Sequence, residues 1–339
     1  MKDPIGREKV SRVFRGVIRT ASLGSALLAV VLLSASVTVA FSEGGEGEPG
    51  NFCSNTSRAA LKACRNESKD DFWITIGNCN NIPDDDAREA CIADAKPALR
   101  EALQDCADQF EARQEVCEAL GEAPYDPALG TFVDPLEIGA SVSPNPLFPL
   151  VPGVKKVFLN EVEGETTTVA VTRDTKEILG VSCIVVSDIV SDSETGEVLE
   201  DTEDYFAQDV DGNVWYFGEL SKEFEDGDLV SLEGSWKAGR DFAKQGIQMA
   251  ADPMIGDVYR QEFLLGDAED IAEVLSLSGS ATVPLSSASC DGNCLVTKEF
   301  TPLEPDTFEQ KFYVPGIGVI LEFDPGTGAR TELVEISTF

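Results

Sequence analysis

The sequence predicts an α+β protein in which a disulfide-stapled antiparallel helical hairpin precedes an antiparallel β-meander that forms a half-barrel, barrel or sandwich. Three observations support this fold class. Six of the nine cysteines lie in a stretch of helix-forming residues, at spacings that read the same in both directions. Residues 154–339 consist of short runs that alternate apolar and polar side chains. The breaks between those runs are rich in Asp-Gly and Pro-Gly, which are typical of tight hairpins.

The chain opens with six basic residues followed by an apolar run over Leu23–Ala40. This pattern predicts a secretory signal peptide over residues 1–42. The alternative is an uncleaved anchor, because a run of about 18 apolar residues nearly spans a bilayer. A flexible Gly/Glu-rich spacer over 43–52 follows. No second apolar run of that length occurs, so we expect a mature protein that is not embedded in a membrane.

Residues 53–120 are rich in Ala, Leu, Arg, Glu and Gln and are interrupted by "NNIPDDD" at 80–86. We therefore expect two antiparallel helices, with Pro97 kinking or dividing the second. At 100° per residue, the three cysteines of each helix fall on one face. Folding the helices back on each other brings the cysteines together in nested pairs, which predicts the disulfides Cys53–Cys117, Cys64–Cys106 and Cys79–Cys91. Zinc or redox sites need C-x-x-C clusters, which this region lacks.

The seven prolines of residues 121–153 predict a linker, or a segment laid along the surface of the next domain. Residues 154–339 then form the antiparallel β domain. Within it, residues 235–256 lack strand alternation, and we expect a long loop or a helical turn there.

The three remaining cysteines leave two pairings open. Cys183 shares a strand face with Val181 and Val185, which suggests an inward position. A bridge from Cys183 to Cys294 is favoured, because a buried cysteine in an oxidising compartment usually has a partner. The alternative is a small loop closed by Cys290 and Cys294, which leaves Cys183 free.

Charge and composition exclude several functions. The net charge is −35, and residues 121–339 alone hold 12 Lys and Arg against 42 Asp and Glu. Such a surface repels phosphate backbones, so nucleic acid is excluded as a partner. The chain has no histidine, which rules out Ser-His-Asp catalysis and His-ligated metal sites. No cofactor is expected, apart from the calcium alternative that follows.

A calcium loop is one candidate site. Asp209, Asp211 and Asn213 follow the spacing of the first half of such a loop, with Glu219 near the position of its last ligand. An Asp-Gly hairpin explains the same residues without a metal.

Two further groups of residues are candidates for ligand binding. The first could act as a carboxylate acid–base site, or could be a salt-bridged strand and turn, and comprises Arg260, Glu262, Glu269 and Asp270. The second could line an apolar cavity in a curved sheet, or could be ordinary core, and comprises Trp215, Trp236, Tyr259 and Tyr313.

The β domain carries the blocks "GNVWYFGE", "YRQEF" and "TPLEPDTFEQKFYVPGIG". With these blocks and its cysteine-rich helices, the chain resembles a family of exported bacterial proteins. The resemblance implies the compartment and the architecture, and it supplies no catalytic residues.

These observations favour an exported, non-catalytic binding protein of the bacterial periplasm or the extracellular space. We expect it to hold an apolar small molecule, such as a lipid, or a protein partner on its curved sheet. The alternatives are a carboxylate-based hydrolase or lyase, and a calcium-dependent structural or adhesion protein.

Overall fold

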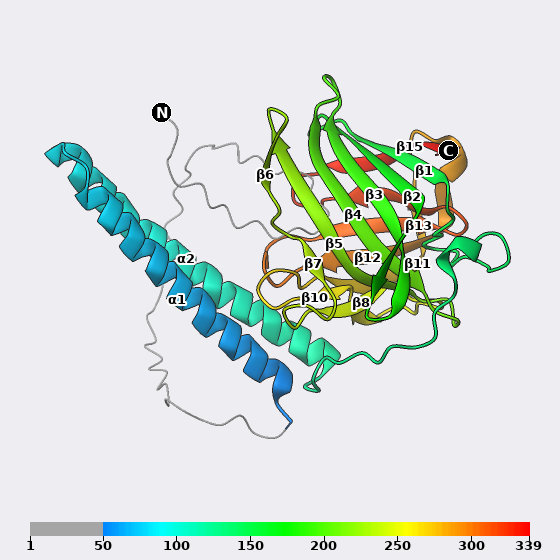
Figure 1. The fold of residues 1–339 in the computed structure, drawn as a ribbon, viewed down its shortest axis with the longest axis horizontal. Coiled ribbons are helices and arrows are strands. Elements are labelled where there is room, and N and C mark those ends of the chain that lie inside the picture. Colours follow the sequence, from blue (N-terminus) through cyan, green and yellow to red (C-terminus); the bar gives the residue numbers. More distant parts are fainter. Residues whose placement is uncertain (1–49) are drawn as a thin grey trace.

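The computed structural model describes residues 50–339, which form a long helical hairpin attached to one end of a strongly curved β-sheet (Figure 1). The α+β architecture predicted from the sequence is confirmed. The predicted signal peptide, residues 1–42, and most of the spacer lie outside the described residues. Within residues 50–339, no helix combines the length and the apolar character needed to cross a membrane.

The hairpin consists of α1 (Phe52–Asn80) and α2 (Asp85–Leu120). The side chain of Asp84 caps α2 by accepting a hydrogen bond from the backbone N–H of Ala87 at 2.8 Å. The three nested disulfides are confirmed, with Cα–Cα distances of 5.6, 5.8 and 5.6 Å for Cys53–Cys117, Cys64–Cys106 and Cys79–Cys91. Two helices alone bury little apolar surface, so covalent bridges supply cohesion that the hairpin core lacks.

The helix α2 continues through Pro97 without being divided. A proline removes one backbone hydrogen bond from a helix. Two disulfides flank this position, at Cys91 and Cys106, and hold both sides of it against α1.

Residues 121–153 lie along the β domain. They contain the short 3-10 helix η1 (Pro135–Glu137), and Phe132 forms a bridge with Asp209. Ile138 and Leu150 are buried in the main core cluster of the β domain. This proline-rich segment therefore contributes apolar side chains to the barrel core.

The sheet contains 15 strands, and every pairing between them is antiparallel. The strands are β1 (Val154–Asn160), β2 (Glu165–Ile178), β3 (Val181–Asp192), β4 (Val198–Gln208), β5 (Val214–Glu225), β6 (Asp228–Ser231), β7 (Trp236–Lys237), β8 (Lys244–Met249), β9 (Val258–Arg260), β10 (Glu262–Phe263), β11 (Ile271–Ala281), β12 (Cys290–Phe300), β13 (Glu309–Val314), β14 (Gly318–Phe323) and β15 (Arg330–Thr338). A second 3-10 helix, η2 (Ser286–Ala288), precedes β12. The hydrogen-bonded order is β10-β8-β5-β4-β3-β2-β1-β15-β14-β13-β12-β11-β9, and β6 and β7 pair with β5.

The two ends of this strand order are consecutive in the chain. β9 pairs with β11 and β10 pairs with β8, and only Gln261 separates β9 from β10. The chain thus joins both edges of the sheet at one end, which makes a near-barrel. A Cβ at Gly246 would lie 2.3 Å from the backbone of Gln261, so this closure depends on a glycine in β8.

The expectation of a loop or helical turn over residues 235–256 is wrong, because this region holds the strands β7 and β8. In β8, Gln245 and Gln248 are buried although they are polar. Buried glutamines remove the alternation that would have marked the strand.

The favoured bridge between Cys183 and Cys294 is also wrong. Cys290 pairs with Cys294, and Cys183 is a free, fully buried thiol. In the strand order, five strands separate β3 from β12, so Cys183 cannot reach Cys294. The alternative of a small loop closed within "CDGNC" is the correct one. Burial raises the pKa of the Cys183 thiol to about 12.

Candidate functional site

The near-barrel contains a cavity of about 140 Å³. One wall is apolar and comes mainly from β1, β2 and β3, with residues 148–150 covering it. Its members are Phe148, Leu150, Phe158, Val169, Val171, Val186, Val190 and Val319. A space this large holds several waters or a small molecule.

The cavity is also lined by acidic side chains, two of which, Glu165 and Asp188, come from β2 and β3 themselves. Nine carboxylic acid side chains line the cavity, namely Glu165, Asp188, Glu200, Asp204, Glu219, Glu262, Asp270, Glu299 and Glu322. Two lysines, Lys156 and Lys311, accompany them. Strand alternation explains why they converge, since residues two apart on β4, such as Thr202 and Asp204, point to the same face.

Lys311 of β13 forms an ion pair inside the cavity. Its Nζ lies 2.8 Å from Glu299 Oε2 and 3.7 Å from Glu322 Oε1, and its side chain is 3% exposed. Burial alone would lower the pKa of Lys311, but the charges of Glu299 and Glu322 outweigh it and raise this pKa. The hydroxyl of Tyr313 also donates to Glu299, at 2.7 Å. Lys311 therefore carries its charge in the barrel interior.

Tyr216 of β5 connects two other carboxyl groups. Its hydroxyl oxygen lies 2.6 Å from Asp204 Oδ1 and 2.8 Å from Glu219 Oε2. A phenol has one proton to donate, so one of the two carboxyls must bring a proton of its own. Burial raises the pKa of Asp204 to about 7, and burial together with the charge of Asp204 raises the pKa of Glu219. The group can therefore gain or lose a proton near neutral pH.

Glu262 of β10 and Asp270, just before β11, form a second carboxyl pair. Burial raises the pKa of both groups, and the charge of Asp270 raises that of Glu262 further. Asp270 Oδ1 is buried and has no hydrogen-bond partner. One unsatisfied acceptor thus lies at this end of the cavity wall.

Asp188 of β3 has fewer hydrogen-bond partners than any other carboxyl group that lines the cavity. Its side chain is 5% exposed, it lines the cavity between Val186 and Val190, and neither of its oxygens has a hydrogen-bond partner. Burial is the largest cause of its raised pKa, followed by the charges of Asp204 and Glu200. Buried polar groups in folded proteins nearly always have partners, so an orphan here requires an explanation.

Three of the predicted binding residues line this cavity, namely Glu262, Asp270 and Tyr313. The other five lie elsewhere. Trp236 packs edge-on against Tyr216, with ring centroids 5.3 Å apart. The Arg260 guanidinium lies 4.8 Å from the centroid of the Phe263 ring. Trp215 and Tyr259 pack against the main core cluster, outside the lining of the cavity.

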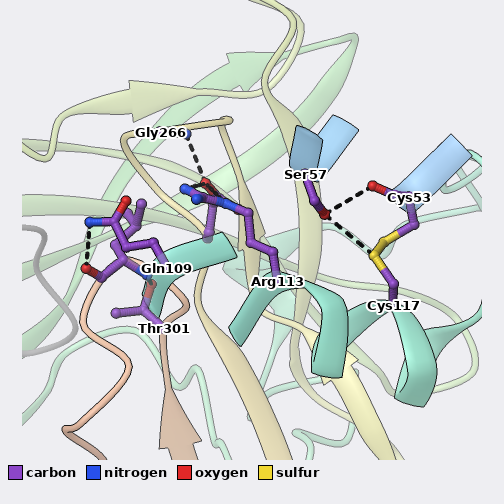
Figure 2. A network of polar contacts seen from close by, with 9 residues as sticks. Cys53, Ser57, Gln109, Arg113, Cys117, Gly266 and Thr301 are labelled. Carbon is purple, nitrogen blue, oxygen red and sulfur yellow. Dashed lines mark hydrogen bonds and ion pairs between the residues drawn. A yellow bond between two sulfur atoms is a disulfide. The ribbon is translucent and has the colours of Figure 1, made fainter. Parts of the chain in front are cut away.

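Glu269 holds the hairpin to the barrel. Arg113 of α2 donates to both of its carboxylate oxygens, at distances from 2.7 to 3.1 Å. Nearby, Gln109 Nε2 donates to the backbone oxygen of Leu303. Figure 2 shows Arg113 reaching the β domain beside Gly266, whose N–H donates to the same carboxylate, and Gln109 reaching it beside Thr301. Within the predicted group, Glu269 is thus bound by Arg113 and Gly266, whereas Glu262 and Asp270 line the cavity.

The predicted calcium residues form a hairpin turn. Both oxygens of Asp209 accept hydrogen bonds, from the backbone N–H groups of Asp211 and Asn213 and from the side chains of Asn213 and Trp215. Within residues 50–339, no group of three or more Asp, Glu or Cys side chains is arranged to hold a metal ion. The Asp-Gly hairpin, which was the other interpretation of this motif, accounts for every one of these contacts.

Sequence reasoning missed the most informative cavity residues, which are Asp188, Asp204, Glu219 and Lys311. A signal for Asp188 was present, because it is the one charged residue in the otherwise apolar inward row of "IVVSDIV". The sequence alone does not say which face of β3 is concave. These residues could therefore be assigned to the cavity only from the curved sheet.

No protein-family model and no curated protein matches this chain. Two solved structures resemble it distantly. One, from Bacteroides fragilis, is described as an exported protein with a YmcC-like fold; it is 14% identical, the match covers 57% of this chain and 99% of that one, and the TM-score is 0.32. The other, described as a lipoprotein from Parabacteroides distasonis, is 10% identical, with coverage of 58% and 100% and a TM-score of 0.30. Neither description names a ligand or a reaction.

Proposed function

We propose that this chain is an exported binding protein of the bacterial periplasm or extracellular space that holds a small ligand inside its near-barrel. The four disulfides favour a compartment outside the cytosol. The observation that carries the proposal is the cavity that contains the orphan carboxyl of Asp188. An unpartnered buried carboxyl destabilises the fold, so its presence in a hollow space is explained by a ligand that it contacts.

The chemistry of the walls narrows the expected ligand. A purely apolar molecule would pack against the valine side chains but would leave both oxygens of Asp188 and Oδ1 of Asp270 without hydrogen bonds. A ligand with both an apolar part and polar groups would contact both kinds of side chain. The sequence led us to expect an apolar small molecule, such as a lipid, or a protein partner, and the acidic side chains of the cavity narrow that expectation.

The test is binding by the full exported chain. Native mass spectrometry of protein purified without denaturation would detect a retained molecule. Thermal-shift measurements with amines, carboxylic acids, sugars and fatty acids would find classes that bind. The variant Val190→Phe narrows the cavity from its apolar wall, and Val185→Ile, on the opposite face of β3, is the matched control.

We expect at least one class to raise the melting temperature of the wild type and of Val185→Ile but not that of Val190→Phe. If no class raises the wild-type melting temperature and no molecule is retained, the proposal is wrong. The wild-type result decides this even if Val190→Phe does not fold.

A further inference from the structure

We propose that the ligand is an aliphatic diamine or polyamine, with one ammonium group at Asp188 and a second at Asp270. This inference rests on the proposed function, since it names the ligand class of the same cavity. Three observations carry it: two orphan acceptors, an excess of carboxyls over amines, and a valine wall between polar groups.

Asp188 provides the first contact. Both of its oxygens lack partners, although its side chain is almost fully buried and lines the cavity. An alkylammonium group carries three N–H donors and no acceptor, which matches a carboxylate with unused lone pairs. The flanking side chains of Val186 and Val190 would contact the methylene chain attached to that nitrogen.

Asp270 provides the second contact. Its Oδ1 is buried without a partner, and Glu262 lies beside it. Asp188 belongs to β3, whereas Asp270 immediately precedes β11, so the two acceptors come from different parts of the barrel wall. A ligand with two donor groups joined by a chain would contact both, and an ammonium group at each end supplies such donors.

The cavity already contains an example of this chemistry. The ammonium group of Lys311 lies between Glu299 and Glu322 at 2.8 and 3.7 Å. Its butyl stem is the same kind of aliphatic chain that a diamine carries. Nine carboxyl groups line the cavity with only two lysines, so Lys311 and Lys156 cannot pair with all of them.

Other ligand classes fit less well. In residues 50–339, no three acidic or cysteine side chains are grouped to hold a metal ion, whereas calcium takes six to eight oxygen ligands. A neutral polyol would supply hydrogen bonds but no charge, and an anion would be repelled by the acidic side chains. Burial is the main cause of the raised pKa values of Asp188 and Asp270, and a bound cation would lower both by favouring the charged forms.

The experiment is isothermal titration calorimetry of the full chain at about 0.15 M salt, which screens surface attraction. The probes are putrescine, cadaverine and spermidine, and the controls are pentylamine, pentanediol and calcium chloride. Asp188→Asn removes the charge at the first contact without changing its shape. The matched control, Asp201→Asn, removes a carboxylate from the outer face of β4, where Asp201 pairs with Lys222.

We expect one of the three amines to bind best, because the separation between Asp188 and Asp270 is fixed. Asp188→Asn and Asp270→Asn should each weaken its affinity by about tenfold or more, and Asp201→Asn by less than about twofold. Pentylamine should bind at least about tenfold more weakly than cadaverine, because it satisfies only one contact.

Three results would overturn the diamine inference. Equal affinity of the wild type and Asp188→Asn for amines would mean attraction to the acidic surface only. Binding of pentanediol as tight as that of cadaverine would mean a neutral ligand, and tight calcium binding would mean a metal site. None of these three results decides whether the barrel holds a ligand at all. That proposal is tested separately by the Val190→Phe experiment, and it is wrong only if no class of molecule binds.

Discussion

The guanidinium of Arg113 on α2 donates hydrogen bonds to both carboxylate oxygens of Glu269. This ion pair is almost completely buried, with side chains 6% and 2% exposed. The two residues are 156 positions apart in the chain. This contact joins the disulfide-stapled hairpin to the barrel, in a place where water cannot replace either partner.

Removing one partner of this pair should be costly. We expect Arg113→Met to lower the free energy of unfolding by about 3–5 kcal/mol, because it leaves the Glu269 charge buried and uncompensated. The double variant Arg113→Met with Glu269→Met should recover most of that loss. Chemical denaturation measures both. Lys244→Met, which breaks the exposed pair with Asp126, should change stability by only about 0–1 kcal/mol, and an equal effect of the two single variants would contradict the prediction.

Asp188→Val should make the protein more stable. The substitution replaces an unpartnered buried carboxyl with a side chain like its neighbours Val186 and Val190, so we expect a gain of about 1–3 kcal/mol. Guanidinium titration measures the change. A loss of stability would show that Asp188 has a structural partner, and retained amine binding by this variant would contradict the proposed ligand contact.

Stability should fall as the pH rises from 4 to 7. Burial raises the pKa of Asp204 from the usual 3.8 to about 7, among the neighbouring groups Glu200, Tyr216, Glu219 and Lys311. The folded chain keeps a proton that the unfolded chain releases above its own pKa of 3.8, so the stabilisation is fully present below that pH and lost as the pH rises through about 7. Denaturation at several pH values should show this slope, and Asp204→Asn should flatten it while Asp201→Asn does not. A steeper or unchanged slope in Asp204→Asn would refute the assignment.

Diamine affinity should change with pH in the opposite direction. The ammonium groups stay charged up to about pH 10, whereas the cavity carboxyls ionise as the pH rises. We therefore expect tighter binding at pH 8 than at pH 5, with protons released on binding. Calorimetry in buffers of different ionisation enthalpy detects that release. Proton uptake, or binding that weakens with rising pH, would be incompatible with carboxylates as the contacts.

One thiol should be detectable, and only after unfolding. Cys183 is fully buried, and burial raises its pKa to about 12, so the reactive thiolate is scarce. A thiol reagent should leave the native chain unmodified and label one residue in concentrated guanidinium, and peptide mapping should place the label at Cys183. A label at Cys290 would instead support the bridge that the structure contradicts.

The Asp209 turn should depend on its carboxylate and not on calcium. Asp209→Ala leaves four donors without their acceptor, and we expect a loss of about 1–3 kcal/mol. Asp211→Ala is the control and should be nearly neutral. Thermal melting with millimolar calcium or a chelator completes the test, and a rise in melting temperature that both variants abolish would favour the metal interpretation.

The hairpin could be predicted from the sequence because helical periodicity is regular. Six cysteine positions were enough to determine which residues face each other, and no knowledge of the barrel was needed. The Arg113–Glu269 pair had no such signal, since it depends on how the hairpin docks.

The cavity could be predicted only in part. On β3, both faces carry apolar residues, with Cys183 and Val185 on one and Ile184 and Val186 on the other. Alternation therefore separates the faces without saying which is concave. Register shifts of one residue, such as the one where Asp204 and Phe206 of β4 pair with Glu219 and Tyr216 of β5, also reverse the side on which later residues lie. Asp188 and Lys311 consequently come together through curvature, which short sequence patterns do not encode.

The stapled hairpin also has a mechanical consequence. At about 1.5 Å per residue, its helices are roughly 45–55 Å long, and three covalent rungs keep them from sliding or separating. A force applied at the turn near Asp84 would be transmitted along the stapled hairpin to its base. At the base, hydrogen bonds and the buried ion pair hold the hairpin against the barrel, and the peptide chain after Leu120 stays continuous with it. The hairpin would therefore undock from the barrel, still tethered by residues 121–153, before its two helices could separate.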